Sequence, residues 1–243
     1  MLPFTSEQFL ANFGRYNETV WPLHLVLAAL ALAGLVGLFA GGLRGRRFTF
    51  AVLGFLWLWM AFVYHAAFFS AINPAAWLFA TLFAAGGIAF GWAVRAAAPA
   101  ARPARGPRAA AGWLLVAYAL AGYPAAAHLA GQRYPDVPTF GLPCPTTIFT
   151  LGVLLLIAAP PRHLFVVPLL WSAVGTAGAV RLGIPEDYGL TAAGAIALGF
   201  VLARRRRGEA QVQPFAGSDS ANRAPRSTQA ASSASAAMPA GET

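Results

Sequence analysis

The chain has 243 residues, of which 58% are hydrophobic and only 10% are charged, and its mean hydropathy is +0.60. Soluble globular domains carry about 25% charged residues, so this composition excludes an ordinary soluble enzyme. It also excludes a chain that is disordered throughout, because such chains are poor in apolar residues and rich in charge. The composition predicts an integral membrane protein, and we expect the lipid bilayer to be its main interaction partner.

The basic residues are all arginines, and the 17 of them outnumber the 8 acidic residues, which gives a net charge of +9. They stand in short clusters between apolar runs. Such clusters are typical of membrane-protein loops, whereas nucleic-acid binding needs a continuous basic surface. We therefore expect no nucleic-acid partner. The single cysteine, Cys144, excludes an intramolecular disulfide.

Residues 1–20 precede the first apolar run and predict a short amphipathic helix. Thr5 can cap this helix, with Gln8 three positions later as the second member of a capping box. Apolar side chains then recur at helical spacing on one face, namely Phe9, Phe13, Tyr16 and Val20. We expect this helix to lie on the outer membrane surface or to pack over the ends of the spans.

Seven apolar runs follow in residues 21–207. About 20 helical residues cross the hydrocarbon core of a bilayer, and four runs reach this length: Trp21–Gly42, Phe48–Ser70, Ala75–Val94 and Gly112–Gly131. Three later runs are shorter: Thr146–Ala159, Leu164–Val180 and Gly189–Ala203. The fifth run reaches full length only with the residues from Phe140 onward, which include Pro143 and Pro145. We predict an all-α, polytopic transmembrane helical bundle of about seven spans.

The arginines predict which way the bundle faces. If seven spans alternate, twelve arginines fall on one side, namely Arg44, Arg46, Arg47, Arg95, Arg102, Arg105, Arg108, Arg162 and Arg204 to Arg207. Three fall on the other side, namely Arg15, Arg133 and Arg181. Arginine-rich loops stay in the cytoplasm, so we expect the N-terminus outside and the C-terminus inside. Residues 208–243, rich in Ala, Ser, Pro and Gly, predict a disordered cytoplasmic tail.

Three of the four histidines and the cysteine fall near the outer ends of the predicted spans: His24, His65, His128 and Cys144. Imidazole and thiolate bind Zn, Cu and haem iron, so this layer is a candidate metal site. Residues at similar depth could add hydrogen bonds: Tyr64, Asn73 and Tyr123. The alternative is that these histidines serve interfacial solvation and helix packing, since no metal-ligand spacing links them. The identity of any cofactor stays unknown.

A second candidate site is the segment in which two prolines flank the cysteine, composed of Pro143, Cys144, Pro145, Thr146 and Thr147. Proline removes a backbone donor and restricts the residue before it, so a regular helix cannot pass through this segment. Broken helix starts with free carbonyls and nearby hydroxyls are places where transporters bind substrates. The alternative is a span that simply begins at a proline, with Thr146 or Thr147 as its cap.

Signatures of soluble catalysis are missing from the sequence, among them a phosphate-binding glycine loop, HExxH and G-x-S-x-G. We therefore expect no enzyme. The leading hypothesis is transport or binding of a small solute or metal ion near the outer face. The alternatives are a membrane haem- or metal-binding redox protein, and a non-catalytic interaction protein that uses the N-terminal helix. Protein partners and homo-oligomerisation stay open.

Two stretches of the sequence carry a resemblance to a known family. The first comprises Pro3-Phe4-Thr5, Glu7-Gln8-Phe9, Tyr16-Asn17 and Val20-Trp21-Pro22. The second runs from Phe140 to Gly152 and reads FGLPCPTTIFTLG. Both are similar to stretches of an uncharacterised bacterial family of multi-pass membrane proteins. The resemblance implies a bacterial inner-membrane protein with a domain of unknown function, and it implies no activity, cofactor or site residue.

Overall fold

The computed structural model of the protein describes residues 3–212. Contacts between residues divide the chain into two units, residues 1–203 and residues 204–243. The described part is helical apart from isolated β-bridges, which confirms the all-α class. Its last helix continues to Val212 and so enters the segment predicted as a disordered tail. The rest of that segment, residues 213–243, lies outside the described residues.

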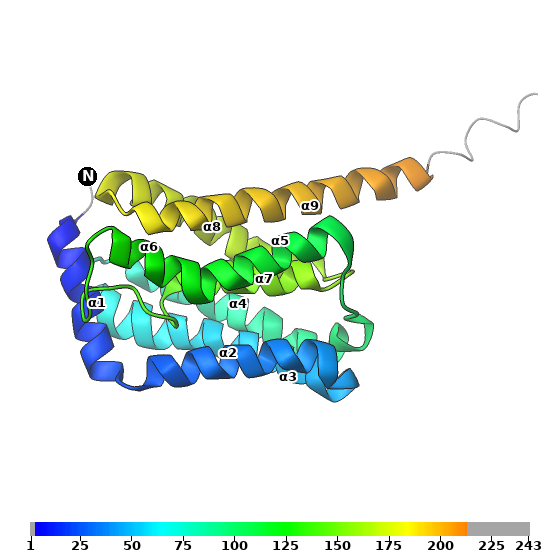
Figure 1. The fold of residues 1–243 in the computed structure, drawn as a ribbon, viewed down its shortest axis with the longest axis horizontal. Helices are drawn as coiled ribbons and strands as arrows, with labels where there is room; N and C mark the ends of the chain where they lie inside the picture. The colour runs from blue at the N-terminus through cyan, green and yellow to red at the C-terminus, as the bar shows by residue number, and fades with distance from the viewer. Residues whose placement is uncertain (1–2, 213–243) are drawn as a thin grey trace, which may run out of the picture. The chain divides into compact units, whose positions relative to one another are not determined.

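The helices follow the apolar runs in chain order (Figure 1). They are α1 (Ser6–Val20), α2 (Leu23–Ala40), α3 (Gly42–Trp59), α4 (Ala76–Ala96), α5 (Gly106–Ala117), α6 (Tyr123–Leu129), α7 (Pro143–Leu156), α8 (Val166–Leu182) and α9 (Tyr188–Val212). Short π and 3₁₀ segments extend or join them: η1 (Met60–Phe68), η2 (Phe69–Ala71), η3 (Ala98–Ala100), η4 (Tyr118–Gly122), η5 (Arg162–Phe165) and η6 (Pro185–Asp187). Because η1 continues α3, and η4 joins α5 to α6, these segments form two longer helical passes.

Within residues 3–212, six helical segments are long and apolar enough to cross a membrane. They coincide with six of the seven predicted runs, so the helical bundle is confirmed, with six candidate membrane spans in place of about seven. The fifth run forms α7, which has 14 residues. A helix of that length rises about 21 Å at 1.5 Å per residue, which is short of a hydrocarbon core about 30 Å thick.

Helix α7 is buried within the bundle along nearly its whole length. It packs tightly on α5, because a Cβ atom built on Gly152 would lie 2.9 Å from the carbonyl oxygen of Gly112. Glycine at both positions therefore lets the two backbones touch. The helix ends early since Pro160 and Pro161 follow closely and disfavour helical backbone before them.

The chain between α4 and α5 folds inward to meet the end of α7. The Ala104 N–H donates to the Leu156 carbonyl at 2.7 Å, and the Ala158 N–H donates to the Arg102 carbonyl at 2.8 Å. The Arg108 guanidinium adds hydrogen bonds to the carbonyls of Leu154 and Ala158. These donors satisfy carbonyl groups that a helix end leaves without an intrahelical partner. A short helix can therefore end inside the bundle without stranding its backbone polar groups.

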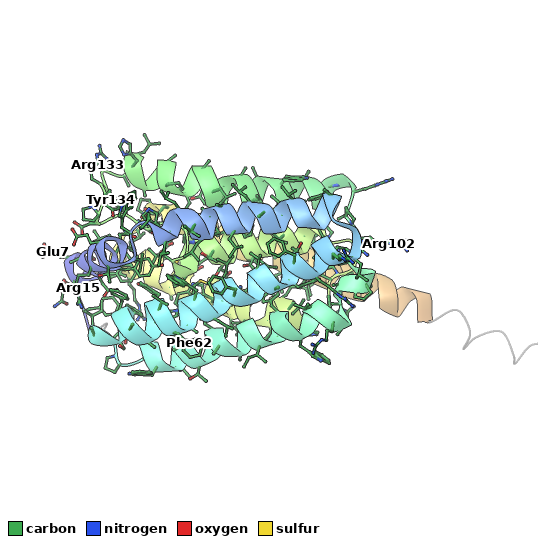
Figure 2. All side chains as sticks on the ribbon, turned by 90° about the horizontal axis from the view of Figure 1, so that it is seen from below. Glu7, Arg15, Phe62, Arg102, Arg133 and Tyr134 are labelled. Carbon is green, nitrogen blue, oxygen red and sulfur yellow. The ribbon has the colours of Figure 1, made fainter. Side chains whose placement is uncertain are left out.

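Residues 1–203 have two ends that differ in charge. The α1 end contains α1, the connection between α6 and α7, and the turn between α8 and α9, and it holds Arg15, Arg133 and Arg181. The opposite end, called the arginine end below, contains the α2–α3 turn, the α4–α5 connection and η5. It holds Arg44, Arg46, Arg47, Arg95, Arg102, Arg105, Arg108 and Arg162. Figure 2 shows Glu7, Arg15 and Arg133 at one end and Arg102 at the other.

Helix α1 begins with the predicted capping box, in which the Thr5 hydroxyl accepts from the Gln8 N–H and the Gln8 side chain accepts from the Thr5 N–H. Its inner face is buried on the bundle, so the helix packs over the ends of the spans. The Trp59 indole donates to the Tyr16 hydroxyl at 2.8 Å, and the Asn17 amide donates to two carbonyls of the α6–α7 connection. Burial raises the pKa of the Tyr16 phenol, which keeps it neutral.

Candidate functional site

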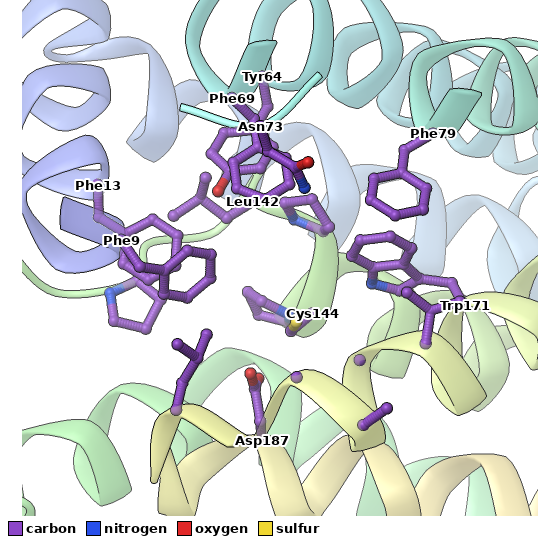
Figure 3. Close-up of a pocket in the computed structure, with 18 of the residues that line it drawn as sticks. Phe9, Phe13, Tyr64, Phe69, Asn73, Phe79, Leu142, Cys144, Trp171 and Asp187 are labelled. Carbon is purple, nitrogen blue, oxygen red and sulfur yellow. The ribbon is translucent and has the colours of Figure 1, made fainter. Parts of the chain in front are cut away.

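A cavity of about 280 Å³ lies at the α1 end of the bundle, where α1, η1, α7, α8 and η6 meet (Figure 3). Its wall is mainly apolar, and aromatic rings reach it from α1 and the residues before it, η1, η2, α4 and α8: Phe4, Phe9, Phe13, Tyr64, Phe69, Phe79 and Trp171. Its polar lining groups are few, namely Asn73, Tyr123, Cys144, Arg181 and Asp187. The cavity is therefore an apolar pocket with a small set of converging polar groups.

The start of α7 forms one side of this cavity. Pro143, Cys144 and Pro145 line it, so the structure brings three of the five predicted substrate-binding residues together at one wall. Thr146 and Thr147 are fully buried and do not belong to the lining. The helix begins at a proline, where the missing N–H costs nothing. The helix begins at a proline and also presents its first turn to a cavity, while the binding role of this segment stays a prediction.

The turn before α7 is held by glycine and threonine. Gly141 has φ +99°, and a Cβ atom there would lie 2.5 Å from Cδ1 of Leu27. The Gly141 N–H donates to the Thr146 hydroxyl at 3.1 Å. Thr146 therefore caps the turn that precedes the helix rather than the helix itself, and this turn fixes where Cys144 enters the cavity.

Asp187 at the end of η6 forms the floor of the cavity, and its side chain is only 5% exposed. Its carboxylate accepts a hydrogen bond from the Tyr123 hydroxyl, and the Cys144 thiol lies beside it. Figure 3 shows the Asp187 carboxylate directed toward Cys144. The Trp171 indole N–H lies next to the Cys144 sulfur without meeting an acceptor at hydrogen-bond geometry. The polar groups of α6, α7, α8 and η6 thus converge on one side of the cavity.

Glu186, the neighbour of Asp187, is completely buried. One of its carboxylate oxygens accepts from the Gln132 amide at 2.5 Å, and the other has no hydrogen-bond partner. The Tyr118 hydroxyl donates to the Glu186 backbone carbonyl at 2.8 Å and ties η4 to this turn. Two adjacent buried acids therefore stand where α9 begins.

The structure keeps the predicted metal ligands apart. His24 is buried against the rings of Trp21 and Tyr134 at the start of α2, whereas His128 is exposed near the end of α6. His65 is fully buried in η1, and neither of its ring nitrogens has a hydrogen-bond partner. Only Cys144 of the four lines the cavity. Within residues 3–212, no three His, Cys, Asp or Glu side chains come together as a metal site.

Sequence reasoning located some of the cavity and missed the rest. Tyr64, Asn73 and Tyr123, expected at the depth of the candidate site, all line it. Asp187 and Trp171 were missed as site residues. The signal for Asp187 was a pair of acids directly after Pro185, just before an apolar run, which is also the ordinary pattern of a solvated helix N-terminus. Only the folded chain shows that α6 and α8 pack against this turn and bury the acid.

Comparison with known proteins identifies the family of the chain and nothing narrower. No curated protein and no solved structure matches the chain. A family model matches residues 6–212, which include α1, the candidate spans, α7 and the residues at the cavity floor. The resemblance to an uncharacterised family is thereby confirmed. The chain belongs to the family described as "Family of unknown function (DUF6064)".

Proposed function

We propose that this protein binds a small organic solute in the cavity at the α1 end. The observation that carries the proposal is the cavity itself, in which aromatic walls surround Asn73, Cys144 and Asp187. Pockets for small molecules are concave and mostly apolar, with a few placed polar groups, and typically measure about 300–1,000 Å³. A volume of about 280 Å³ fits a ligand near the small end of that range.

A solute fits the cavity better than a metal ion or a haem does. The cavity offers one thiol and one carboxylate among aromatic rings, and the three histidines near the α1 end do not reach it as lining residues. Zinc and copper sites need three or four N, S or O ligands in a defined geometry. Among the described residues, this set of donors favours an organic ligand over the metal-binding and redox alternatives.

Access to the cavity is expected from the α1 end. Beyond the cavity toward the arginine end, the buried Trp57 indole donates to the Thr150 hydroxyl at 3.1 Å, and α7 fills the middle of the bundle. Binding from the α1 end is then the first step of the solute transport that we favour for this protein. Transport itself requires a second conformation that opens toward the arginine end.

We propose the arginine end as cytoplasmic and the α1 end as external, in the inner membrane of a bacterium. The unequal distribution of arginines between the two ends supports this orientation. The test places single cysteines at Glu18 in α1 and at Ala100 in η3, both exposed, in a Cys144→Ser background. A membrane-impermeant maleimide added to intact cells should label Glu18→Cys and not Ala100→Cys. The reverse pattern would invert the proposed topology.

The binding proposal is tested through Cys144, because it is the single cysteine of the chain. N-ethylmaleimide is small enough to enter the cavity, so it should label Cys144 in the folded protein in detergent. Gly178 lines the cavity with open space around its Cβ position, so Gly178→Leu should fill part of the cavity without a clash. We expect this variant to slow labelling about tenfold, since a cavity-filling side chain removes the volume that the reagent needs.

Gly199→Leu is the matched control, because Gly199 is exposed on α9 and also has open space around its Cβ position. It should label at the wild-type rate. Labelling of the wild type only after denaturation would show that small molecules do not reach the cavity, and equal rates in all three proteins would show that the reagent arrives by another route. Either result removes the binding proposal.

A further inference from the structure

The residues at the cavity floor indicate which class of ligand the cavity binds. This inference rests on the solute-binding function proposed above. Asp187 is 5% exposed and directs its carboxylate into the cavity (Figure 3). Its neighbours are the Tyr123 hydroxyl, which donates a hydrogen bond to it, and the Cys144 thiol, and both groups are neutral. A buried carboxylate with only neutral partners is costly unless it is protonated or finds a cation.

The second buried acid adds negative potential at the same place. Glu186 is fully buried, and one of its carboxylate oxygens has no hydrogen-bond partner. The arginine among the cavity-lining residues, Arg181, has an exposed side chain at the rim. The floor of the cavity is therefore acidic, whereas the positive charge of Arg181 is exposed to solvent at the rim.

The walls of the cavity suit the apolar part of a ligand whose positive charge lies at the acidic floor. Rings from α1, η2 and α8 provide apolar contact, and aromatic rings also attract an organic cation through their electron-rich faces. The Trp171 indole N–H is buried without an acceptor, so it can donate to an ether or hydroxyl oxygen of the same molecule. An inorganic cation fits poorly, because it needs several oxygen ligands and the wall supplies mainly carbon.

We infer that the cavity takes an organic ammonium compound with an apolar body, which places its charged nitrogen at Asp187 and its apolar part against the aromatic wall. Asp187 is the residue that selects for positive charge. Phe9 and Trp171 make the apolar contacts on opposite sides of the cavity, as Figure 3 shows.

The experiment measures how far three matched probes protect Cys144 from N-ethylmaleimide. The probes are 2-phenylethylamine, 2-phenylethanol and phenylacetate, which share a ring and differ in charge. Protection is the ratio of labelling rates with and without the probe in the same protein, so it cancels any change in the reactivity of the thiol. In the wild type we expect the amine to protect at about tenfold lower concentration than the alcohol, as an ion pair shielded from water allows. Phenylacetate should protect least.

Two variants show where this preference comes from. Asp187→Asn keeps the shape of the side chain and removes its charge, and it should make the amine and the alcohol equally effective. Glu18→Gln removes one negative charge from an exposed position on α1 and should keep the wild-type preference. If Asp187→Asn does not fold, the ranking of the three probes on the wild type still decides the matter.

The outcomes separate the two proposals. Equal protection by amine and alcohol in the wild type, or stronger protection by phenylacetate, would overturn the inference while the cavity remains a binding site. Absence of protection by all three probes would also overturn it. Failure of the solute-binding proposal has a different signature, because then the reagent does not reach Cys144 through the cavity and Gly178→Leu has no effect on labelling.

Discussion

Replacing Gly141 by alanine tests how the connection between α6 and α7 is built. The residue has φ +99°, a region that side chains with a Cβ atom rarely adopt. Its Cβ position lies 2.5 Å from Cδ1 of Leu27 and 3.2 Å from the hydroxyl oxygen of Tyr16. Both neighbours are buried, so neither side chain can move aside into solvent. The variant therefore meets backbone strain and overpacking together.

The two contributions can be given magnitudes. Left-handed backbone costs an alanine about 1–2 kcal/mol. Overpacking in a filled core costs typically about 1–3 kcal/mol. The free energy of unfolding should therefore fall by about 2–5 kcal/mol in Gly141→Ala, if the two costs add. Gly131→Ala is the matched control, because Gly131 has φ +92° in the same connection and nothing within 4 Å of its Cβ position. In Gly131→Ala the free energy of unfolding should fall only by the cost of left-handed backbone, about 1–2 kcal/mol.

The measurement is the apparent Tm of the two variants and the wild type in the same detergent, followed by fluorescence-detected size-exclusion chromatography. For a chain of this size, 1 kcal/mol corresponds to about 2–4 °C of Tm. Gly141→Ala should therefore melt about 2 °C or more below Gly131→Ala. Equal melting temperatures would show that Leu27 and Tyr16 do not press on Gly141, and the described packing between α1, α2 and this turn would be refuted.

Three further predictions concern side chains that hold α1 and α7 in the bundle. Thr150→Val leaves the buried Trp57 N–H without the acceptor that it meets at 3.1 Å and should lower the free energy of unfolding by about 1–3 kcal/mol, so an unchanged Tm would contradict this hydrogen bond. Thr5→Ala removes the cap of α1 and should cost about 0.5–2 kcal/mol, seen as faster hydrogen exchange in α1 with unchanged exchange in α7. Arg108→Ala should destabilise the protein by about 1–3 kcal/mol, because the Leu154 and Ala158 carbonyls lose charged donors, and an unchanged Tm would contradict this role.

Local features of α1 and α7 could be predicted from the sequence, because they depend on residues close together in the chain. The capping box of Thr5 and Gln8 needs only a separation of three residues, and it is present. The proline at the start of α7 fixes where that helix begins. The six long apolar segments follow from the same logic, since in lipid each helix must satisfy its own backbone.

The tertiary structure decided which residues that are distant in the sequence lie close together. Asp187, Cys144 and Trp171 lie on different elements, and no spacing along the chain indicates that they meet around one cavity. Helix α7 could be short because Ala104 and Arg102 reach its end from a connection more than fifty residues earlier. Periodicity reports which face of a helix is apolar, but only packing decides which faces meet. The physical reason is that pairing distant segments is a property of the whole bundle, whereas helix starts, caps and lengths are set by neighbours in sequence.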